Sequence, residues 1–303
     1  MRPLFEGPVD IVGDVHGEID LLRSLLGHLG YSADGFHPEG RRLVLVGDLT
    51  DRGPDSPAVV ELVQQFVLAG RAQCVLGNHD LNLLLNHPKH DNGWFYGEEF
   101  HSQGQVIPQK LADLETRQRV LDFFASLPLA LERADLRVVH ACWQNEMLAL
   151  ARQATNAVAL CHTYAERIDQ EARGRTGLDA IDLALLHQNR NPVKLITSGP
   201  EERSETPFEA AGRIRYERRV LWWNNYHDVF CVFGHYSVSD GASRGNESSF
   251  CIDYGVGKRW TERQAGKTNG FVWKLAALRY PERIVVFDDG SQSLEAAANG
   301  GSV

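Results

Sequence analysis

Several short apolar runs in the sequence each end at a turn that carries carboxylate, amide or imidazole side chains. These runs occupy residues 9–12, 42–46, 72–76, 136–139 and 229–233. The polar residues that follow them are Asp14, His16, Asp48, Asn78, His140 and His235. Apolar residues at helical spacing follow the first two runs, over residues 19–26 and 58–69. Repeated strand–loop–helix units predict a layered α/β fold, with these polar side chains gathered at the ends of its strands.

The six polar residues are suitable ligands for divalent metal ions. Carboxylate oxygen, imidazole nitrogen and amide oxygen bind such ions, and two ions about 3.5–4 Å apart can share a bridging carboxylate. Asp14 and His16 alternate within one turn, so both can face one ion, and Asp48 can bridge to a second. The remaining ligands of the second ion are then Asn78, His140 and His235. The sequence therefore predicts a site for two divalent metals.

Three residues beside the proposed ligands are candidates for catalysis. His79 directly follows a proposed ligand and can donate a proton to a leaving oxygen. Asp51 can hold the His79 ring in one tautomer, and Arg52 can bind a phosphate through two parallel hydrogen bonds. Asp51 and Arg52 could instead form a structural ion pair, because Gly53 and the proline after it are themselves a turn signal.

Four segments with these residues occur in an order that is typical of one enzyme family. They are GDVHG at 13–17, GDLTDRG at 47–53, GNHD at 77–80 and GH at 234–235. They resemble the signature blocks of the phosphoprotein phosphatase family of calcineurin-like metallophosphoesterases. The resemblance implies a two-layer β-sandwich core flanked by helices, and substrate contacts from Arg52 and Asn78. It also implies that a hydroxide bridging two metal ions attacks phosphorus while His79 acts as the general acid.

Within that family, residues 37–41, 47–54 and 278–282 resemble a small bacterial branch that contains asymmetric diadenosine-tetraphosphate hydrolases. The expected substrate is therefore a nucleotide phosphoanhydride such as diadenosine tetraphosphate. Trp94 and Tyr96 belong to an aromatic segment that can stack on a nucleobase, with packing inside the protein as the alternative. The same ligand set also suits a protein serine/threonine phosphatase acting on a phosphoprotein. An RNA-end phosphatase is a further alternative, and it needs a basic stripe such as the arginines at 213–219.

The proposed ligands can bind several metals, and the sequence departs from the family pattern. We expect manganese, although iron, zinc, cobalt or nickel can bind to the same oxygen and nitrogen ligands. Asp80 stands where the family usually has glutamate, in a position expected to support the ligands. The second phosphate-binding arginine of the family has no clear counterpart, and the candidates for it are Arg213, Arg215 and Arg218.

The order of apolar and polar stretches predicts one metallophosphoesterase domain over residues 1–290. Residues 141–228 depart from the pattern, with a polar, Ala-rich helical stretch over 149–172, and we expect them to form a mainly helical inserted cap. A capped site favours a small nucleotide over a phosphopeptide. Residues 291–303 are rich in Ala, Gly and Ser, which predicts a disordered tail.

Composition limits the partners and the location that we expect. The net charge of −9 offers no general attraction to nucleic acid or to an anionic membrane, so a phosphate-bearing substrate needs a local positive site. The five cysteines are far apart and odd in number, which argues against a disulfide framework and favours a reducing cytoplasm. We expect no membrane partner and no stable binding of nucleic acid. The sequence leaves the oligomeric state open.

Overall fold

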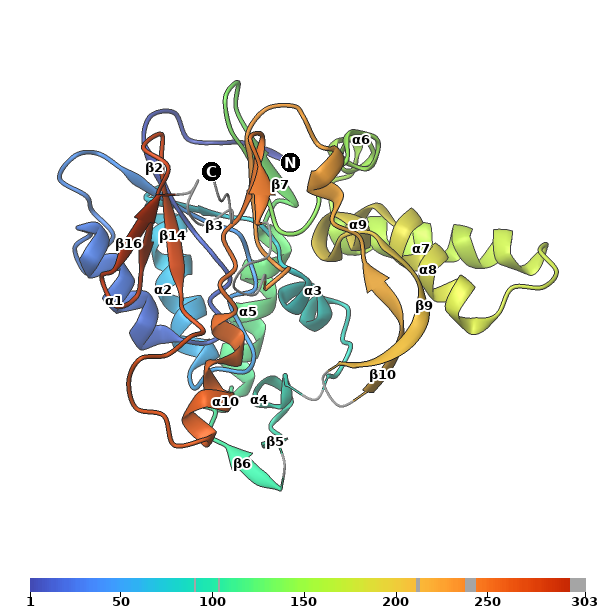
Figure 1. Cartoon of the computed structure of the whole chain (residues 1–303), viewed down its shortest axis with the longest axis horizontal. Coiled ribbons are helices and arrows are strands. Elements are labelled where there is room, and N and C mark those ends of the chain that lie inside the picture. Colours follow the sequence, from blue (N-terminus) through green and yellow to red (C-terminus); the bar gives the residue numbers. More distant parts are fainter. Residues whose placement is uncertain (90, 103, 211–212, 238–243, 295–303) are drawn as a thin grey trace.

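Two six-stranded β-sheets form the centre of the computed structural model, which describes residues 1–89, 91–102, 104–210, 213–237 and 244–294 (Figure 1). The strand order of the first sheet is β16 (Gln292–Leu294), β15 (Ile284–Phe287), β14 (Ala276–Tyr280), β2 (Val9–Val12), β3 (Arg42–Leu45) and β4 (Ala72–Cys74). The order of the second is β1 (Arg2–Pro3), β7 (Ala130–Glu132), β8 (Arg137–Val139), β11 (Cys231–Phe233), β13 (Ser249–Cys251) and β12 (Gly245–Asn246). The two-layer sandwich predicted from the sequence is confirmed.

Alternating side chains of the strands explain why the sheets pack face to face. In β2, Ile11 points to the other sheet and packs in one buried cluster with Val138 of β8 and Val232 of β11. Its neighbour Val12 belongs to a separate cluster on the opposite face, where it meets the helices. Because successive side chains of a strand point to opposite faces, a continuous apolar run fills both layers at once.

Parallel pairing brings the ends of the central strands to one edge of the sandwich. In the first sheet β2, β3 and β4 are parallel, and in the second sheet β8, β11 and β13 are parallel. The carboxyl ends of parallel strands lie at the same edge of a sheet, and ligand sites in α/β folds form there. The polar turns that follow these strands therefore meet in one place.

Helices flank the sandwich, as the family resemblance implies (Figure 1). Of these, α1 (Ile19–Leu29) and α2 (Ser56–Leu68) pack against the first sheet, and α5 (Leu114–Ser126) packs against α2 and α3 (Asn78–Leu84). The short helix α4 (Gly93–Tyr96) lies below the sheets, near α10 (Arg259–Gln264). Asp55 caps α2 by accepting a hydrogen bond from the backbone N–H of Ala58, and Pro57 lies in the first turn. A small hairpin of β5 (Phe100–Ser102) and β6 (Gln105–Ile107) projects from the body and contacts α10, which follows the short helix η2 (Val256–Lys258).

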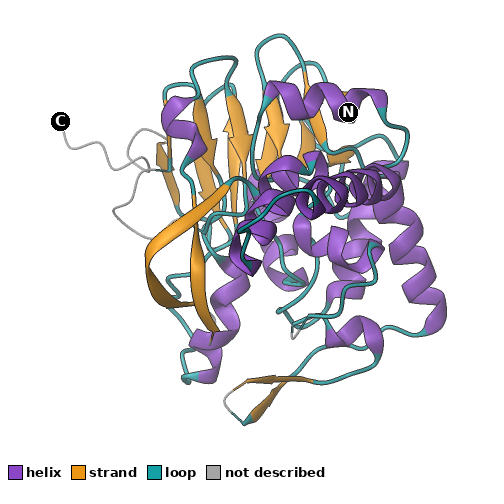
Figure 2. Ribbon diagram, turned by 90° about the vertical axis from the view of Figure 1, so that its right-hand side faces the viewer, coloured by secondary structure: helices purple, strands orange, loops and turns teal. Residues whose placement is uncertain are grey.

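The segment from 141 to 228 contains four helices, a β-hairpin and a short 3-10 helix. They are α6 (Asn145–Gln153), α7 (Ala157–Arg173), α8 (Ala180–Arg190), α9 (Pro192–Ser198), β9 (Glu201–Ala210), β10 (Arg213–Arg219) and η1 (Trp222–Asn225). The sequence did not predict the hairpin, which curves away from the two sheets (Figure 2). Its residues are mostly polar and exposed, so the apolar alternation that marks a buried strand is missing. The interpretation of 141–228 as an inserted cap stays a prediction.

The C-terminal boundary differs from the expected one. Residues 292–294 form β16, which pairs antiparallel with β15, so the chain is still part of the first sheet where we expected a disordered tail from 291. The backbone hydrogen bonds to β15 account for the order of these polar residues. The rest of the expected tail, 295–303, lies outside the described residues. Among the helices that are described, none is both long and apolar enough to cross a membrane.

Candidate metal centre

The backbone at the strand ends adopts an unusual conformation. Eight non-glycine residues have positive φ in the described chain, and five of them belong to the predicted site. These five are His16 (47°), Asp48 (50°), Asp51 (77°), Arg52 (66°) and His235 (71°). Such left-handed conformations cost about 1–3 kcal/mol each and persist where the surrounding structure enforces them, which is common at functional sites. The turns therefore aim these side chains in directions that a relaxed strand end would not give.

His16 faces the two carboxylates from the ends of β2 and β3. Its Nε2 atom lies 3.9 Å from Asp14 Oδ2 and 3.8 Å from Asp48 Oδ2, while its Nδ1 lies 3.0 Å from the carbonyl oxygen of Thr50. A carbonyl oxygen only accepts hydrogen bonds, so Nδ1 carries the proton and the lone pair of Nε2 points at the carboxylates. Burial and the charge of Arg52 lower the pKa of His16 to about 3, which keeps the ring neutral.

The second group of donors comes from both sheets. The Oδ1 atom of Asn78 lies 3.1 Å from Nε2 of His140 and 2.7 Å from Nδ1 of His235, and His140 Nε2 also lies 3.4 Å from Asp48 Oδ1. His140 donates its Nδ1 proton to the carbonyl oxygen of Val46 at 2.7 Å, as a metal-binding histidine commonly does. Asp48 belongs to a cluster with His16 and His79 and to another with His140 and His235. It is therefore placed to bridge two ions.

The electrostatics of these buried groups favour a bound cation. Burial and the nearby Asp253 carboxylate raise the pKa of Asp14 well above its usual value. Burial lowers the pKa of His140, but the carboxylates of Asp48 and Asp14 outweigh it and raise that pKa to about 10. Both shifts arise where buried carboxylates lie close together. A divalent ion among these oxygen and nitrogen donors would offset the negative charge of the carboxylates, so the residues fit two such ions.

Asp80 connects the turns that carry the proposed ligands. Its fully buried carboxylate accepts hydrogen bonds from the backbone N–H groups of Asp48 (2.9 Å), Leu49 (3.1 Å) and Gly77 (3.1 Å). Asp80 thus holds the two turns together, although it is shorter than the glutamate that the family usually has there. Gly77 itself has no room for a side chain, because a Cβ atom would lie 2.2 Å from Oδ1 of Asp48.

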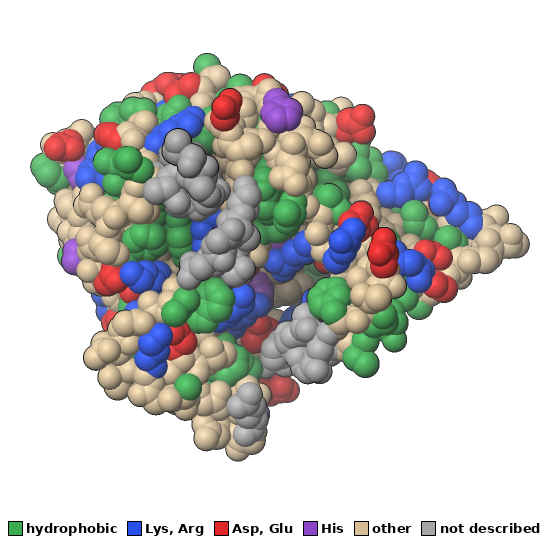
Figure 3. Space-filling model, in the orientation of Figure 1, with side chains coloured by type: hydrophobic (Ala, Val, Ile, Leu, Met, Phe, Trp, Pro, Cys, Tyr) green, Lys and Arg blue, Asp and Glu red, His purple; other side chains and the backbone are tan. Residues whose placement is uncertain are grey.

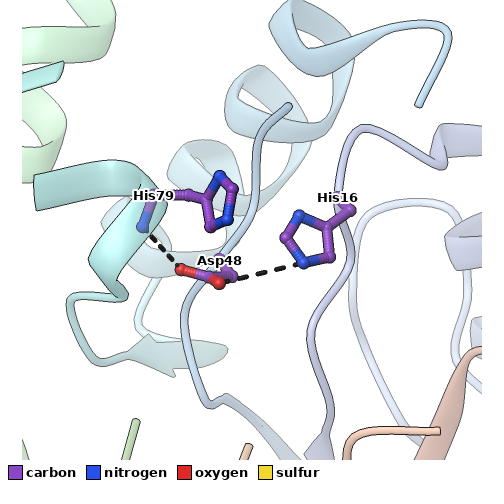
Figure 4. Close-up of side chains that lie close together, drawn as sticks. All are labelled: His16, Asp48 and His79. Carbon is purple, nitrogen blue, oxygen red and sulfur yellow. Dashed lines mark hydrogen bonds and ion pairs between the residues drawn. The ribbon is translucent and has the colours of Figure 1, made fainter. Parts of the chain in front are cut away.

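His79 is oriented by a buried carboxylate. Its Nδ1 lies 2.6 Å from Asp51 Oδ2, and its backbone N–H donates to Asp48 Oδ1 at 2.9 Å; Figure 4 shows that its ring and that of His16 lie on either side of Asp48. The other oxygen of Asp51 accepts a hydrogen bond from the indole N–H of Trp94 at 2.7 Å. Burial and Arg52 lower the pKa of His79, but Asp48, Asp51 and Asp91 together raise it to about 9.

Arg52 lies beside His79 rather than in a structural pair with Asp51. Its Nε donates to Asp91 Oδ2 at 2.9 Å, and its Nη2 lies 3.0 Å from Nε2 of His79. Asp91 is buried and was not predicted from the sequence, since it lies in an irregular loop that no strand-end pattern marks. The guanidinium is thus held at the mouth of the metal centre, where it can meet a phosphate oxygen.

Five of the proposed ligands, all except the fully buried His140, line a pocket of about 550 Å³ that the β9–β10 hairpin borders. Arg215, Arg219 and Lys258 line this pocket together with Arg52, which provides the local positive charge that the acidic chain needs. Figure 3 shows a hollow between the main body and the hairpin side of the molecule, with basic side chains beside it. Nη1 of Arg219 also donates to the carbonyl oxygen of His235 at 2.9 Å.

The candidates for the second phosphate-binding arginine lie in different surroundings. Arg215 lines the pocket, whereas Arg218 forms an ion pair with Glu202 at 2.8 Å on the surface. The side chain of Arg213 lies outside the described part of the structure. Arg219 was considered only as part of a basic stripe, because it lies in a hairpin that sequence periodicity does not reveal. Its contact with His235 makes it a stronger candidate for the second phosphate-binding arginine.

Two aromatic residues do not take the role that we expected. Trp94 is fully buried and uses its indole N–H for Asp51, so it has no free face for a nucleobase. Tyr96 packs edge-on against Phe95, with ring centroids 5.3 Å apart, and does not line the metal pocket. Of the two alternatives for Trp94, its burial matches packing inside the protein and not stacking on a nucleobase.

One further carboxylate at the site follows the end of a strand, the same sequence pattern that marks the proposed ligands. Asp253 follows β13 just as Asp14 follows β2, and it is buried. Its Oδ2 accepts hydrogen bonds from the backbone N–H and the hydroxyl of Ser237, at 2.6 and 2.7 Å. Asp253 thus fixes the loop after His235 and adds negative charge beside Asp14.

Comparison with known families and proteins agrees with this geometry. The family model described as calcineurin-like phosphoesterase matches residues 7–199. The chain is 47% identical over 74 residues to the asymmetrical bis(5'-nucleosyl)-tetraphosphatase PrpE of Oceanobacillus iheyensis and 51% identical over 73 residues to that of Halalkalibacterium halodurans. Each match covers 23% of this chain and 30% of the relative, so the similarity spans less than a third of these curated relatives.

A solved structure shares the fold over most of the chain. It is a cold-active protein tyrosine phosphatase, with a TM-score of 0.51 and 18% sequence identity. The match covers 98% of this chain and 82% of that one. At this level of identity the likeness concerns the fold alone.

Proposed function

Because this chain belongs to the calcineurin-like phosphoesterase family, we propose that it is a metal-dependent hydrolase of a nucleotide phosphoanhydride such as diadenosine tetraphosphate. One observation carries the proposal. Asp48 is shared by two clusters of buried donors, and the oriented pair of His79 and Asp51 lies directly beside it. Such an arrangement suits attack on phosphorus with proton transfer to the leaving oxygen.

The proposed metal sites divide the ligands between two ions. Asp14 and His16 would hold the first ion, Asp48 would be shared by both ions, and Asn78, His140 and His235 would hold the second. When bound, the two ions supply positive charge and lower the pKa of water to about 7. Manganese remains our expectation for both sites.

The chain's own residues bind the phosphate and handle the proton. Arg52, held by Asp91, donates hydrogen bonds to phosphate oxygens, and Arg219 binds from the hairpin side of the pocket. His79 gives its Nε2 proton to the leaving oxygen, and Asp51 keeps the ring oriented and stabilises its charged form. A phosphate oxygen between Arg52 and His79 would replace the contact that these two side chains make with each other.

Two observations favour a nucleotide as the substrate. The relatives with 47% and 51% identity are bis(5'-nucleosyl)-tetraphosphatases, although the match covers a short part of each. The β9–β10 hairpin borders the pocket and brings Phe208, Arg215 and Glu217 close to the metal centre. A bordered pocket suits a compact polyphosphate better than an extended phosphopeptide.

The test compares two substrates with manganese present. Diadenosine tetraphosphate and a phosphoserine peptide are offered separately, and products are resolved by ion-exchange chromatography. We expect ATP and AMP from the dinucleotide and little phosphate from the peptide. The variant Asp48→Asn should lower the turnover number at least about a hundredfold, because it removes the shared ligand charge. Asp122→Asn, an exposed carboxylate on α5, is the control and should retain full activity.

Two results would contradict the proposal. Wild-type turnover by Asp48→Asn would remove the metal-dependent mechanism. Rapid release of phosphate from the peptide, with the dinucleotide intact, would replace the nucleotide hydrolase by a protein phosphatase with the same metal centre.

A further inference from the structure

A second pocket lies beside the metal centre, on the other side of Arg52. It has a volume of about 500 Å³. Its apolar lining includes Pro54, Ile107, Pro108 and Trp260, and its polar lining includes the amides of Gln105 and Gln264. Apolar walls with a few well-placed polar groups are typical of pockets that bind small organic molecules. The residues that line it come from the β5–β6 hairpin, from the turn after β3 and from α10.

Two features make this pocket continuous with the metal centre. Arg52 lines both pockets, and the segment 256–264 contributes Lys258 to the metal pocket and Trp260 to the second one. The segment lies directly against the site, because a Cβ atom at Gly257 would be 2.5 Å from Cδ2 of His16 and 2.9 Å from Nη1 of Arg52. A molecule whose phosphate is bound by Arg52 can therefore extend into the second pocket.

Helix α10 is held in place relative to the metal centre. Arg263 donates two hydrogen bonds of 2.6 Å each to the carboxylate of Glu18, which is buried two residues after His16. Trp260 lies one turn before Arg263 on the same helix, and its ring packs edge-on against Phe100 with a centroid distance of 5.2 Å. The indole is thus oriented before any ligand arrives, while part of its surface stays accessible.

The chemistry of the pocket suits an uncharged planar group. Its two arginines, Arg52 and Arg263, already form ion pairs with Asp91 and Glu18, and Asp20 adds a carboxylate to the lining, so the pocket offers little attraction to a second anion. Gln264 donates from Nε2 to Gln105 Oε1 at 3.0 Å and to the carbonyl oxygen of Ser102 at 3.2 Å. Side-chain amides of this kind can exchange hydrogen bonds with the edge of a base, and an aromatic ring stacks on its face.

From this geometry we propose that the second pocket binds a nucleoside of the substrate, with its base stacked on Trp260. The inference rests on the nucleotide hydrolysis proposed above and names the residues that select a nucleotide. Arg52 then lies between the reacting phosphate in the metal pocket and the nucleoside in the second pocket. Trp260 takes the stacking role that the sequence suggested for Trp94.

The test compares a nucleotide with a substrate that has no nucleoside. With manganese present, Trp260→Ala should raise KM for diadenosine tetraphosphate about fivefold to a hundredfold, because one base–aromatic stack is lost. Kinetic constants for p-nitrophenyl phosphate should stay unchanged. Trp260→Phe should recover most of the affinity. Phe36→Ala removes an exposed aromatic outside both pockets and serves as the control.

A second variant tests the same pocket in case Trp260→Ala fails to fold. Val106 lines the pocket and is 49% exposed, so Val106→Trp should fill the pocket without disturbing the core and should also raise KM for the dinucleotide. Unchanged KM in both variants would overturn the inference. So would a raised KM in Phe208→Ala alone, because that result would place the base under the β9–β10 hairpin.

Failure of the proposed function can be told apart from failure of this inference. If the dinucleotide is not hydrolysed, equilibrium dialysis of ADP against the wild-type protein and Trp260→Ala still measures the pocket. Binding that is at least about fivefold weaker in the variant would keep the pocket as a nucleoside site. Equal binding, or none to either protein, would remove it.

Discussion

The orientation of His79, the proposed general acid, depends on two successive hydrogen bonds. Asp51 is fully buried, and one of its oxygens accepts from His79 Nδ1 while the other accepts from the indole of Trp94. With both oxygens engaged, the carboxylate cannot rotate without losing a bond. We therefore expect Trp94 to act as a positioning residue that orients His79 through Asp51.

Replacing Trp94 by phenylalanine tests this role. Trp94→Phe keeps an aromatic ring in the core but removes the hydrogen bond to a charged group, which contributes about 1.5–3 kcal/mol. We expect the turnover number to fall about tenfold to a hundredfold, with KM and manganese content unchanged. Trp143→Phe loses a bond to Asn145 instead and is the matched control. Equal effects of the two variants on turnover would show that Trp94 only packs.

At the scale of secondary structure, the segments 37–41 and 278–282 lie away from the metal pocket. Arg41 precedes β3 and forms a buried pair with Asp10 of β2, at 2.8 Å between Nη2 and Oδ1. Its Nη1 also donates to Glu282, in the turn after β14, at 2.8 Å. Tyr31 donates to Asp10 Oδ2 at 2.8 Å. These residues join three neighbouring strands at the edge opposite the ligands, so the two segments support the sheet.

The Arg41–Glu282 pair makes stability depend on pH. Burial alone would raise the pKa of Glu282, but hydrogen bonds from Arg41 outweigh it and lower that pKa. The folded state therefore holds the glutamate proton more weakly than the unfolded state, whose pKa is about 4.3. The stabilisation is present above about pH 4.3 and is lost as pH falls further.

Urea unfolding at two pH values measures this effect. Glu282→Gln should lower the free energy of unfolding by less than about 1 kcal/mol at pH 7, because the pair is partly exposed. The difference from the wild type should shrink at pH 4. Glu39→Gln changes an exposed carboxylate near Arg41 and should show no such trend. A difference that grows on acidification would contradict the assigned sign.

On the scale of the whole molecule, the metal centre joins the two sheets. Asp14, Asp48 and Asn78 follow strands of the first sheet, whereas His140 and His235 follow strands of the second. An ion held by donors from both sheets is released when the sheets separate. Metal binding should therefore stabilise the complete fold and not only the turns.

Manganese titration tests that coupling. Manganese at a hundred times its dissociation constant should increase the free energy of unfolding by about 2.7 kcal/mol for each site, and EDTA should reverse the change. Elemental analysis should find two ions per chain. Asp48→Asn should lose most of the stabilisation, whereas Asp122→Asn should keep it. Identical unfolding curves with manganese and with EDTA would argue against a metal centre that spans both sheets.

The sequence alone determined the layered α/β architecture and the positions of the proposed metal ligands, and the family resemblance implied the sandwich. Buried strands carry continuous apolar runs, and the turns after them carry the donors, so Asp14, Asp48 and Asn78 could be found by their local order. The same reasoning missed the β9–β10 hairpin and misplaced the start of the tail, because polar strands at the edge of a structure have no apolar alternation.

Only the tertiary structure decided which other side chains serve the site. Asp91, Arg219 and Trp260 lie on irregular or exposed segments, and their neighbours come from distant parts of the chain. Trp94 looked like a surface aromatic beside polar residues, yet it is buried against Asp51. Local patterns record which face of an element is apolar, but the partner of a side chain depends on how the elements pack.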